Sequence, residues 1–295
     1  MMHAAIAIGS NSTRMLCAEK REEGLANILR GREETRLFSA LNEQGLFPEE
    51  KIEETARAVE KLHRMAAAHG AADCVLFATS ASRDAKNSNA LSARIRELTG
   101  LNMQVITGEE EARLAFLAVA GQEKTLVMDI GGGSTELTLG DKGCILSAAS
   151  AQMGASRLMK MQPISSLSDG EKALQLAKAA MWPFVEELPG QARGAALVGI
   201  GGTCTASAGM AAGRFFSVED MEGAQVSLQQ AKAQLALLAP MSLKDREQVP
   251  GLPATRAMHM PNGLCILIAV MELLGADRLS VSGRNNLDGY LLSRG

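Results

Sequence analysis

The sequence predicts an α/β protein made of two related domains, and two observations carry this prediction. Strand-like and helix-like segments alternate in both halves of the 295-residue chain. A strand–glycine turn–strand unit also occurs twice, because a shift of 122 residues (131 − 9 = 122) places Ile8-Gly9 on Ile130-Gly131. The same shift aligns the hydroxyl residues that follow, Ser12 and Thr13 with Ser134 and Thr135. Self-similarity at this spacing indicates a duplicated domain and not a short-period solenoid.

The repeat also sets the expected domain limits. We expect a first domain over residues 1–123 and a second over 124–283. A last helix at about 284–295 ends the chain, and its return to the first domain is left open. Two such halves facing each other would form a cleft, with the two glycine turns opposed across it.

In the first half, apolar residues at helical spacing and turn residues mark the elements. Ile52, Ala56 and Val59 recur on one helical face after Pro48, a residue suited to a helix start. The predicted order is a strand, the turn at Gly9–Asn11 and a second strand, a strand at 25–38, a helix at 48–70, a strand at 72–80, a helix at 89–100, a strand at 103–107 and a helix at 109–120.

The second half repeats this pattern. "TLVMDIGGGSTELTLG" is typical of a strand, a glycine turn and a strand, and "AALVGIGGTCTASAGMAA" of a strand, a glycine pair and a helix. The remaining predicted elements are a strand at 144–151, a helix near 169–188 with a kink at Pro183, helices near 227–239 and 262–275, a strand at 278–282 and a short last helix.

Composition narrows the class of protein. A net charge of −3 excludes a general basic field for nucleic acid, so a polyanionic ligand needs a local basic site. The five cysteines form no CxxC pair, and four lie in apolar runs, which favours buried free thiols. Free thiols in turn favour a location in the reducing cytoplasm. No signal peptide is recognised, and the apolar run at 264–275 is too short to span a bilayer.

The glycine turns are the candidate ligand site. Glycines between strands permit a positive φ and let a ligand approach the backbone, and successive N–H groups can form an anion nest. A single such turn would be explained as a tight hairpin in which glycine only relieves strain. Two matched turns, with a third glycine pair before Thr203, favour a phosphate-binding site. Neither turn is a GxxxxGK[ST] or a GxGxxG motif.

Two carboxylates flank the second turn. Asp129 ends an apolar strand and Glu136 follows the glycines. Acids beside an anionic ligand repel it unless a divalent cation lies between them, and Mg²⁺ is usually held by one or two carboxylates with phosphate and water. A solvent-facing Glu136 is the alternative. In "TGEEEAR", Thr107 and Glu110 also have the spacing of a helix capping box.

Five motifs together resemble the exopolyphosphatase/guanosine pentaphosphate phosphatase (Ppx/GppA) family. They are "IGSNSTRML" (8–16), "ATSASRDAKN" (78–87), "ITGEEEARLAF" (106–116), "DIGGGSTE" (129–136) and "GIGGTCTA" (199–206). The resemblance covers nearly the whole chain. It implies two ribonuclease-H-like (actin-like ATPase) domains with an interdomain cleft, and exopolyphosphatase-type hydrolysis. The expected cofactor is Mg²⁺, from the two carboxylates beside the second turn.

The resemblance also implies roles for individual residues. Glu110 would be the general base, Arg83 would offset phosphoryl charge, and Asp129 and Glu136 would hold the metal or orient the water. The implied phosphate-binding residues are Gly9, Ser10, Asn11, Ser12, Thr13, Gly131, Gly132, Gly133, Ser134, Thr135, Gly202, Thr203 and Arg256. Arg14 and Arg157 could add positive charge or lie on the surface.

The chain departs from the family pattern at Ala7, at Met258, where the family reads R-A-D, and at Asn286–Gly289, where the family reads roughly G-L-R-E-G. The family's first turn begins with Asp where this chain has Ala7, the counterpart of Asp129 under the shift. Three hypotheses follow: release of terminal phosphate from polyphosphate, guanosine pentaphosphate 5′-phosphatase activity, and a non-catalytic sensor of polyphosphate or nucleotide motivated by Ala7. The expected partners are polyphosphate or guanosine pentaphosphate and neither nucleic acid nor membrane; a homodimer is left open.

Overall fold

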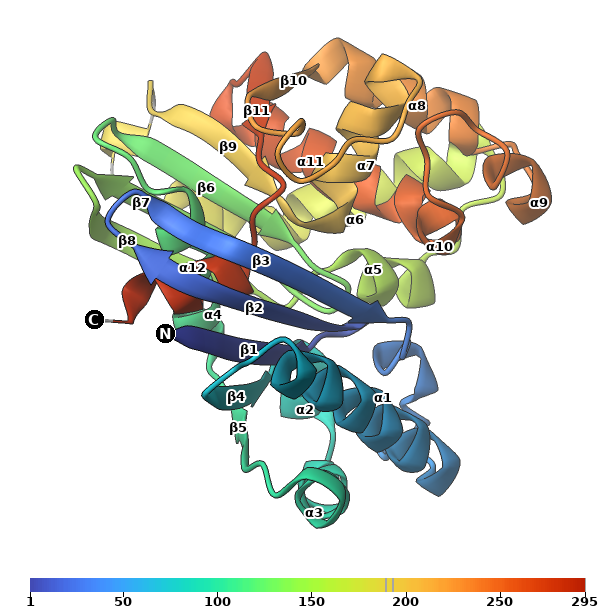
Figure 1. Ribbon diagram of the computed structural model, residues 1–295. Coiled ribbons are helices and arrows are strands. Elements are labelled where there is room, and N and C mark those ends of the chain that lie inside the picture. The colour runs from blue at the N-terminus through green and yellow to red at the C-terminus, as the bar shows by residue number, and fades with distance from the viewer. Residues whose placement is uncertain (189, 193, 295) are drawn as a thin grey trace. The chain divides into compact units, whose positions relative to one another are not determined.

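The computed structural model describes residues 1–188, 190–192 and 194–294, and the chain divides into two compact units (Figure 1). Unit 1 combines Met1–Ala118 with Asn286–Gly295, and unit 2 is Val119–Asn285. The predicted domain limits, at residues 123 and 283, lie close to these. The C-terminal helix α12 (Asn286–Ser293) packs against β1 and β2 of unit 1. Gly295, the last residue of the predicted helix, lies outside the described residues.

Unit 1 is built on a five-stranded mixed sheet with the order β3-β2-β1-β4-β5. The first three strands pair antiparallel, and β1, β4 and β5 run parallel. The strands are β1 (Met2–Ile8), β2 (Thr13–Arg21), β3 (Gly24–Glu33), β4 (Asp73–Ala78) and β5 (Met103–Val105). The carboxyl ends of β1, β4 and β5 therefore meet at one edge, which is where open α/β sheets bind ligands.

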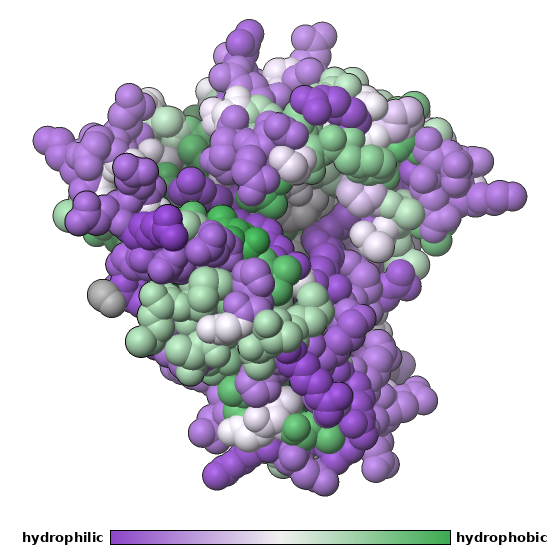
Figure 2. Space-filling view, in the orientation of Figure 1, coloured by the Kyte–Doolittle hydropathy of each residue, from purple (hydrophilic) through white to green (hydrophobic). Residues whose placement is uncertain are grey.

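Helices cover the faces of this sheet because their apolar residues recur at helical spacing. In α1 (Glu49–Ala68), Ile52, Ala56, Val59 and Leu62 are buried, and the outer face is charged. Figure 2 shows a predominantly hydrophilic surface where α1 lies. The other helices of unit 1 are α2 (Ser80–Asp84), α3 (Ser88–Thr99), α4 (Gly108–Val119) and the 3-10 turn η1 (Phe38–Ala40).

Unit 2 contains a six-stranded sheet with the order β8-β7-β6-β9-β11-β10. Its strands are β6 (Thr125–Ile130), β7 (Thr135–Asp141), β8 (Cys144–Ala151), β9 (Ala196–Ile200), β10 (Ala224–Ser227) and β11 (Arg278–Val281). Apart from the added edge strand β10, the order and the strand directions repeat those of unit 1. The predicted α/β class with a duplicated topology is confirmed.

The core of unit 2 surrounds one apolar helix. In α11 (Met260–Leu274), every residue from Met260 to Met271 is buried, so the run that is apolar all round forms the interior of the unit. The other helices are α5 (Ala155–Met161), α6 (Leu167–Glu186), α7 (Gly201–Ala212), α8 (Leu228–Leu238), α9 (Leu243–Arg246), α10 (Ala254–Ala257) and the 3-10 turn η2 (Gly190–Ala192). Among the described helices, none has the length and apolar character needed to cross a bilayer.

Several details differ from the sequence predictions. The strand predicted at 25–38 ends at Glu33, and the pair Gly201–Gly202 opens helix α7 instead of forming a separate turn. The short elements α2, α5, α9, α10 and β10 were not predicted, because four to seven residues carry too little periodicity. The cysteines are free, but Cys144 is exposed and Cys74 only partly buried, so uniform burial of the thiols was wrong.

Candidate phosphate-binding site

The two glycine turns have the same backbone geometry. In unit 1 the amide of Gly9 donates to the carbonyl of Ser12, and in unit 2 the amide of Gly131 donates to that of Ser134, both at 3.0 Å. The strand pairs that close them are also equivalent, Ile8 with Thr13 and Ile130 with Thr135. The predicted correspondence at a shift of 122 residues therefore extends to individual hydrogen bonds.

The carbonyl groups of residues 131–133 in the second turn point toward the chain at the start of α5. Gly131 O accepts from Ala155 N (2.9 Å), and Gly132 O from Ser156 N (2.8 Å). Gly133 O accepts from Arg157 Nε (2.8 Å). A trans peptide directs its N–H opposite to its C=O, so the amides of residues 132–134 point to the other side of the turn. Three amides on one side match the predicted anion nest.

The first turn is held in the same way. Ser10 O accepts from Phe38 N and Asn11 O from Arg36 N, both at 2.9 Å. The amides of residues 11 and 12 consequently point away from the segment at 36–38. Four side chains of this turn are buried, as are those of the second. These are Ser10, Asn11, Ser12 and Thr13 in unit 1, and Ser134 and Thr135 in unit 2.

The hydroxyls of the threonines that follow the two turns, Thr13 and Thr135, make contacts within the fold. Thr13 Oγ1 lies 3.2 Å from Thr35 Oγ1, and Thr135 Oγ1 donates to Met153 O at 2.5 Å. Their hydroxyls therefore anchor the strand that leaves each turn. The predicted phosphate contact of these residues would have to come from the backbone.

Close approach explains the glycines better than a positive φ. Neither Gly9 nor Gly131 lies in the left-handed region, and a Cβ on either would be 3.1 Å from the carbonyl oxygen that closes its turn. A Cβ on Gly154 would lie 2.5 Å from the backbone of Gly132. The turn and the start of α5 can pack at this distance only without side chains at these points.

Asp129 and Glu136 form a buried acid pair beside the second turn. They are direct cross-strand partners on β6 and β7, so their side chains share a face of the sheet. Asp129 is 8% exposed and Glu136 1%. Ser150 Oγ donates to Glu136 Oε1 at 2.8 Å. The alternative of a solvent-facing Glu136 is wrong, because β7 is covered on both faces.

The first turn of α7 contacts Asp129 of this acid pair. A Cβ on Gly201, whose φ is +80°, would lie 2.3 Å from Asp129 Oδ1. The carboxylate therefore lies at the amino end of the helix, where a negative charge is stabilised. A Cβ on Gly202 would overlap the guanidinium of Arg256 on α10, so that cation lies against Gly202. Burial raises the pKa of the Cys204 thiol, and the charge of Asp129 raises it further.

Thr203 faces the interior of unit 2. A Cβ on Gly263 of α11 would lie 2.5 Å from its Oγ1. Its side chain is 5% exposed. Of the predicted phosphate-binding residues around this glycine pair, Gly202 and Arg256 lie against each other, one residue away from the contact of Gly201 with Asp129. Thr203 packs against α11 instead.

In unit 1, the carboxyl edge of the parallel strands gathers the other predicted residues. Thr79 N donates to Ile8 O, which places the start of α2 beside the first turn. On α2, Arg83 donates through Nη1 to Ile106 O (3.0 Å) and to Glu111 Oε2 (2.9 Å). The ion pair is largely buried, with 17% and 10% of the two side chains exposed. Arg83 thus links α2 to α4.

Glu110 closes the predicted capping box. Glu110 N donates to Thr107 Oγ1 (3.1 Å), and Thr107 N donates to Glu110 Oε2 (2.7 Å). Glu110 is exposed on the first turn of α4. The capping interpretation is confirmed, and the catalytic role of the same carboxylate stays a prediction.

Sequence reasoning missed Glu111 as the partner of Arg83. In "EEE" nothing distinguishes the third carboxylate except its helical phase, which turns it toward the buried side with Ala112 and Ala115. It also missed Gly154, which no local pattern marks, and left the position of Arg157 open. The structure places the Arg157 guanidinium against the second turn.

The acid pair fits Mg²⁺ better than a metal ion that needs three or more side-chain ligands. Across residues 1–188, 190–192 and 194–294, no group of three or more His, Cys, Asp or Glu side chains could hold a metal ion. Mg²⁺ keeps several waters and takes one or two carboxylates with substrate phosphate. Asp129 and Glu136 supply that donor set.

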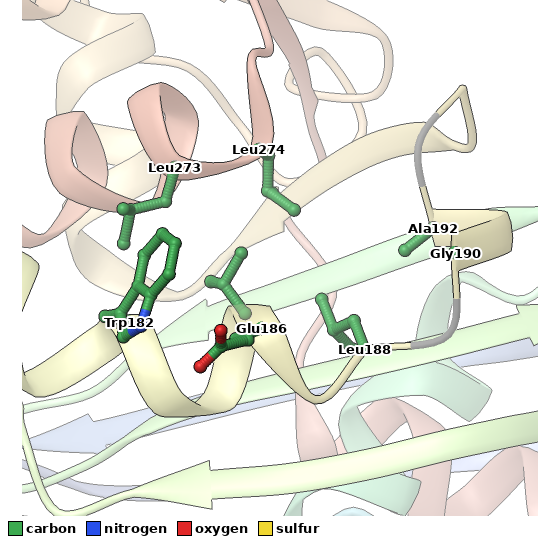
Figure 3. Close-up of a pocket in the computed structure, with 8 residues that line it drawn as sticks. Trp182, Glu186, Leu188, Gly190, Ala192, Leu273 and Leu274 are labelled. Carbon is green, nitrogen blue, oxygen red and sulfur yellow. The ribbon is translucent and has the colours of Figure 1, made fainter.

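An apolar pocket of about 470 Å³ in unit 2 lies apart from these residues. Figure 3 shows Trp182 of α6 and Leu273 of α11 on one side of it and Leu188 on the other. The lining residues are Trp182, Val185, Glu186, Leu188, Gly190, Ala192, Leu273 and Leu274. It shares no residue with the predicted site and lacks the cations that a phosphate chain requires.

Comparison with known proteins identifies the class. A profile of the Ppx/GppA phosphatase family matches residues 16–294, so the chain belongs to this family. A crystal structure of the Aquifex aeolicus family member is similar with a TM-score of 0.83 and 25% identity, covering 99% of this chain and 97% of that one.

Two curated relatives are named for different activities. The Guanosine-5'-triphosphate,3'-diphosphate pyrophosphatase of Photobacterium profundum is 28% identical over 96% of this chain and 57% of its own length. Exopolyphosphatase 1 of Mycobacterium bovis is 25% identical over the full chain and 88% of its own length. The chain spans about half the length of several curated relatives, including the Photobacterium profundum protein.

Proposed function

We propose that this chain is a phosphohydrolase that releases the terminal orthophosphate of inorganic polyphosphate. The observation that carries the proposal is the second glycine turn: its three carbonyls are bonded to the protein, its amides face the other way, and the buried pair Asp129–Glu136 lies beside it. The activity for which the Mycobacterium bovis relative is named supports the substrate class.

In the proposed reaction, a water oxygen bonds to the terminal phosphorus while the bridging P–O bond breaks. Glu110 accepts the proton of the water, and the shortened chain leaves with the bridging oxygen. The backbone amides of the glycine turns and Arg256 bind phosphoryl oxygens, and Arg83 offsets their charge. Asp129 and Glu136 would hold Mg²⁺, which when bound would neutralise charge on the phosphate oxygens.

The role of Glu110 can be tested without removing the helix cap. Glu110→Gln keeps an acceptor for the Thr107 amide, since Gln also serves in a capping box, but cannot accept a proton. We expect phosphate release from polyphosphate with Mg²⁺ to fall by roughly 10²–10⁴-fold at an unchanged melting temperature.

Two variants control this experiment. Glu109→Gln changes the exposed neighbouring carboxylate, and Thr107→Ala removes the other half of the box and keeps the base. Both should release phosphate at close to the wild-type rate. Equal rates for wild type and Glu110→Gln would exclude Glu110 as the base.

A guanosine pentaphosphate 5′-phosphatase is the second candidate, favoured by the activity for which the Photobacterium profundum relative is named. The bond that breaks is again a terminal phosphoanhydride. Turnover of guanosine pentaphosphate and polyphosphate measured side by side, as kcat/KM, decides between the two. A higher value for the nucleotide would replace the first proposal.

Ala7 favours a third candidate, a sensor that binds polyphosphate or nucleotide and does not hydrolyse it. Ala7 is fully buried where the matched position of unit 2 has Asp129. Tight polyphosphate binding with no phosphate release by wild type would support this function. Release that depends on Glu110 would exclude it.

A further inference from the structure

Gly289 is a glycine inside a helix, and close contact with a second helix accounts for it. It lies in the middle of α12, where glycine weakens the helix relative to alanine. A Cβ added to Gly289 would overlap the carbonyl oxygen of Leu114 and lie 3.0 Å from Ala118 N. These are backbone atoms of α4, which cannot give way as a flexible side chain can. Glycine therefore lets α12 pack directly on the backbone of α4.

Charged and apolar contacts hold α12 on the sheet of unit 1. Arg30 of β3 donates through Nη1 to Asp288 Oδ2 at 3.1 Å and through Nη2 to Oδ1 at 2.6 Å. The carboxylate of Asp288 is buried, so this two-bond ion pair is shielded from water. Leu287 and Leu291 are buried in an apolar cluster with residues of β1, β2 and β4. The position of α12 on the sheet is therefore fixed independently of α4.

The helix that α12 supports also carries Glu110. Glu110 lies four residues, about one helical turn, before Leu114 on α4. The amino end of α4 is held by Arg83, which donates to Glu111 Oε2 at 2.9 Å and to Ile106 O at 3.0 Å. Thus α2 fixes one end of α4 and α12 the other. A shift at either end would move the carboxylate of Glu110.

We propose that Gly289 and Asp288 are positioning residues for the reaction, because they fix α4 and, through it, the carboxylate of Glu110. This inference rests on the proposed function, in which Glu110 accepts the proton of the attacking water. A base must lie within hydrogen-bond reach of that water, and a misplacement of about 1 Å can lower a rate by about 10²-fold. Neither residue is assigned a contact with the substrate, so α12 affects the chemical step and not the affinity for polyphosphate.

Gly289→Ala tests the contact between the two helices. The new methyl group overlaps Leu114 O while α12 stays tied to β3, so α4 has to move. We expect kcat for phosphate release to fall about 10–100-fold, with KM within about twofold of wild type. Gly121→Ala is the matched control, because Gly121 follows α4 closely, has open space around it and lies outside the left-handed region. It should keep the wild-type kcat.

A double mutant separates positioning from simple loss of folded protein. In a Glu110→Gln background, Gly289→Ala should lower the residual rate by no more than about twofold, because the displaced group can no longer accept a proton. A variant that only loses folded protein would lose the same factor in both backgrounds, and that result would overturn the proposal. Asp288→Asn keeps the size of the side chain but weakens its pair with Arg30. It should show the same pattern with a fall in kcat of about three- to tenfold, and it replaces Gly289→Ala if that variant does not fold.

Amide hydrogen exchange of α4 distinguishes failure of this inference from failure of the proposed function. Exchange over residues 108–119 is measured by mass spectrometry in wild type, Gly289→Ala and Gly121→Ala. Faster exchange in Gly289→Ala alone supports the fixing of α4 by α12, even if wild type releases no phosphate and the proposed function fails. Unchanged exchange, or a wild-type kcat in Gly289→Ala while hydrolysis depends on Glu110, overturns this inference and leaves the proposed function standing.

Discussion

The same pair of cross-strand positions differs in charge between the two units: an apolar and a cationic residue occupy it in unit 1, and two carboxylates occupy it in unit 2. On β1 and β2 it holds Ala7 and Arg14, and on β6 and β7 it holds Asp129 and Glu136. The turns that these strands enclose close with the same hydrogen bond at the same distance. The backbone has thus been kept in both copies while the side chains beneath it differ in charge.

This difference indicates that the two glycine turns have different binding roles. Two buried carboxylates on one face repel each other and favour a cation between them. Ala7 instead belongs to an apolar cluster with Phe77 and Leu287, next to the cationic Arg14. We therefore propose that the turn of unit 2 binds phosphate together with a metal, and the turn of unit 1 binds phosphate without one.

The largest expected effect is that of Asp129→Asn. The amide keeps the shape of the side chain but removes the charge that would hold Mg²⁺. We expect kcat for phosphate release to fall on the order of 10³-fold and its dependence on Mg²⁺ concentration to weaken. Asp141→Asn, at the far end of the partner strand β7, is the control and should retain full activity. Undiminished, Mg²⁺-dependent turnover in Asp129→Asn would remove unit 2 from the proposed metal site.

Gly201→Ala should have the next largest effect. The added Cβ would press on Asp129 Oδ1 at 2.3 Å, and the φ of +80° is strained for alanine. Displacement of the carboxylate should lower kcat about 10²-fold. Gly213→Ala at the other end of α7 has a φ of +64° and open space around it, so it should cost about 1 kcal/mol of stability and no activity. Equal activities in the two variants would show that the geometry of Asp129 is unimportant.

Much of this fold could be predicted because its signals are local and repeated. The helix at 48–70 has a run of apolar residues at helical spacing, and the structure gives α1 at Glu49–Ala68. The shift of 122 residues predicts the two matched turns, and their hydrogen bonds agree with it. The acid pair also followed from the turn, since flanking residues of a tight hairpin become cross-strand neighbours.

Tertiary contacts account for what the sequence did not reveal. Gly154 is distant in sequence from the turn it packs on, and Glu111 becomes the partner of Arg83 only when α2 and α4 meet. The positive φ expected at the glycine turns occurs at neither Gly9 nor Gly131, where close packing requires glycine, whereas Gly201 of the third pair has a φ of +80°.

Ala7→Asp tests the comparison most directly and should have the smallest effect on activity. The new carboxylate would share a face with Arg14, so the two would form an ion pair and not a metal site. We expect kcat and the Mg²⁺ concentration for half-maximal activity to stay within about threefold of wild type, with about 1–3 kcal/mol of stability lost to burial of a polar group. Ala7→Asn, of similar size and uncharged, is the control. A rise in turnover of more than about tenfold in Ala7→Asp alone would show instead that unit 1 lacks a catalytic acid, as the sensor hypothesis requires.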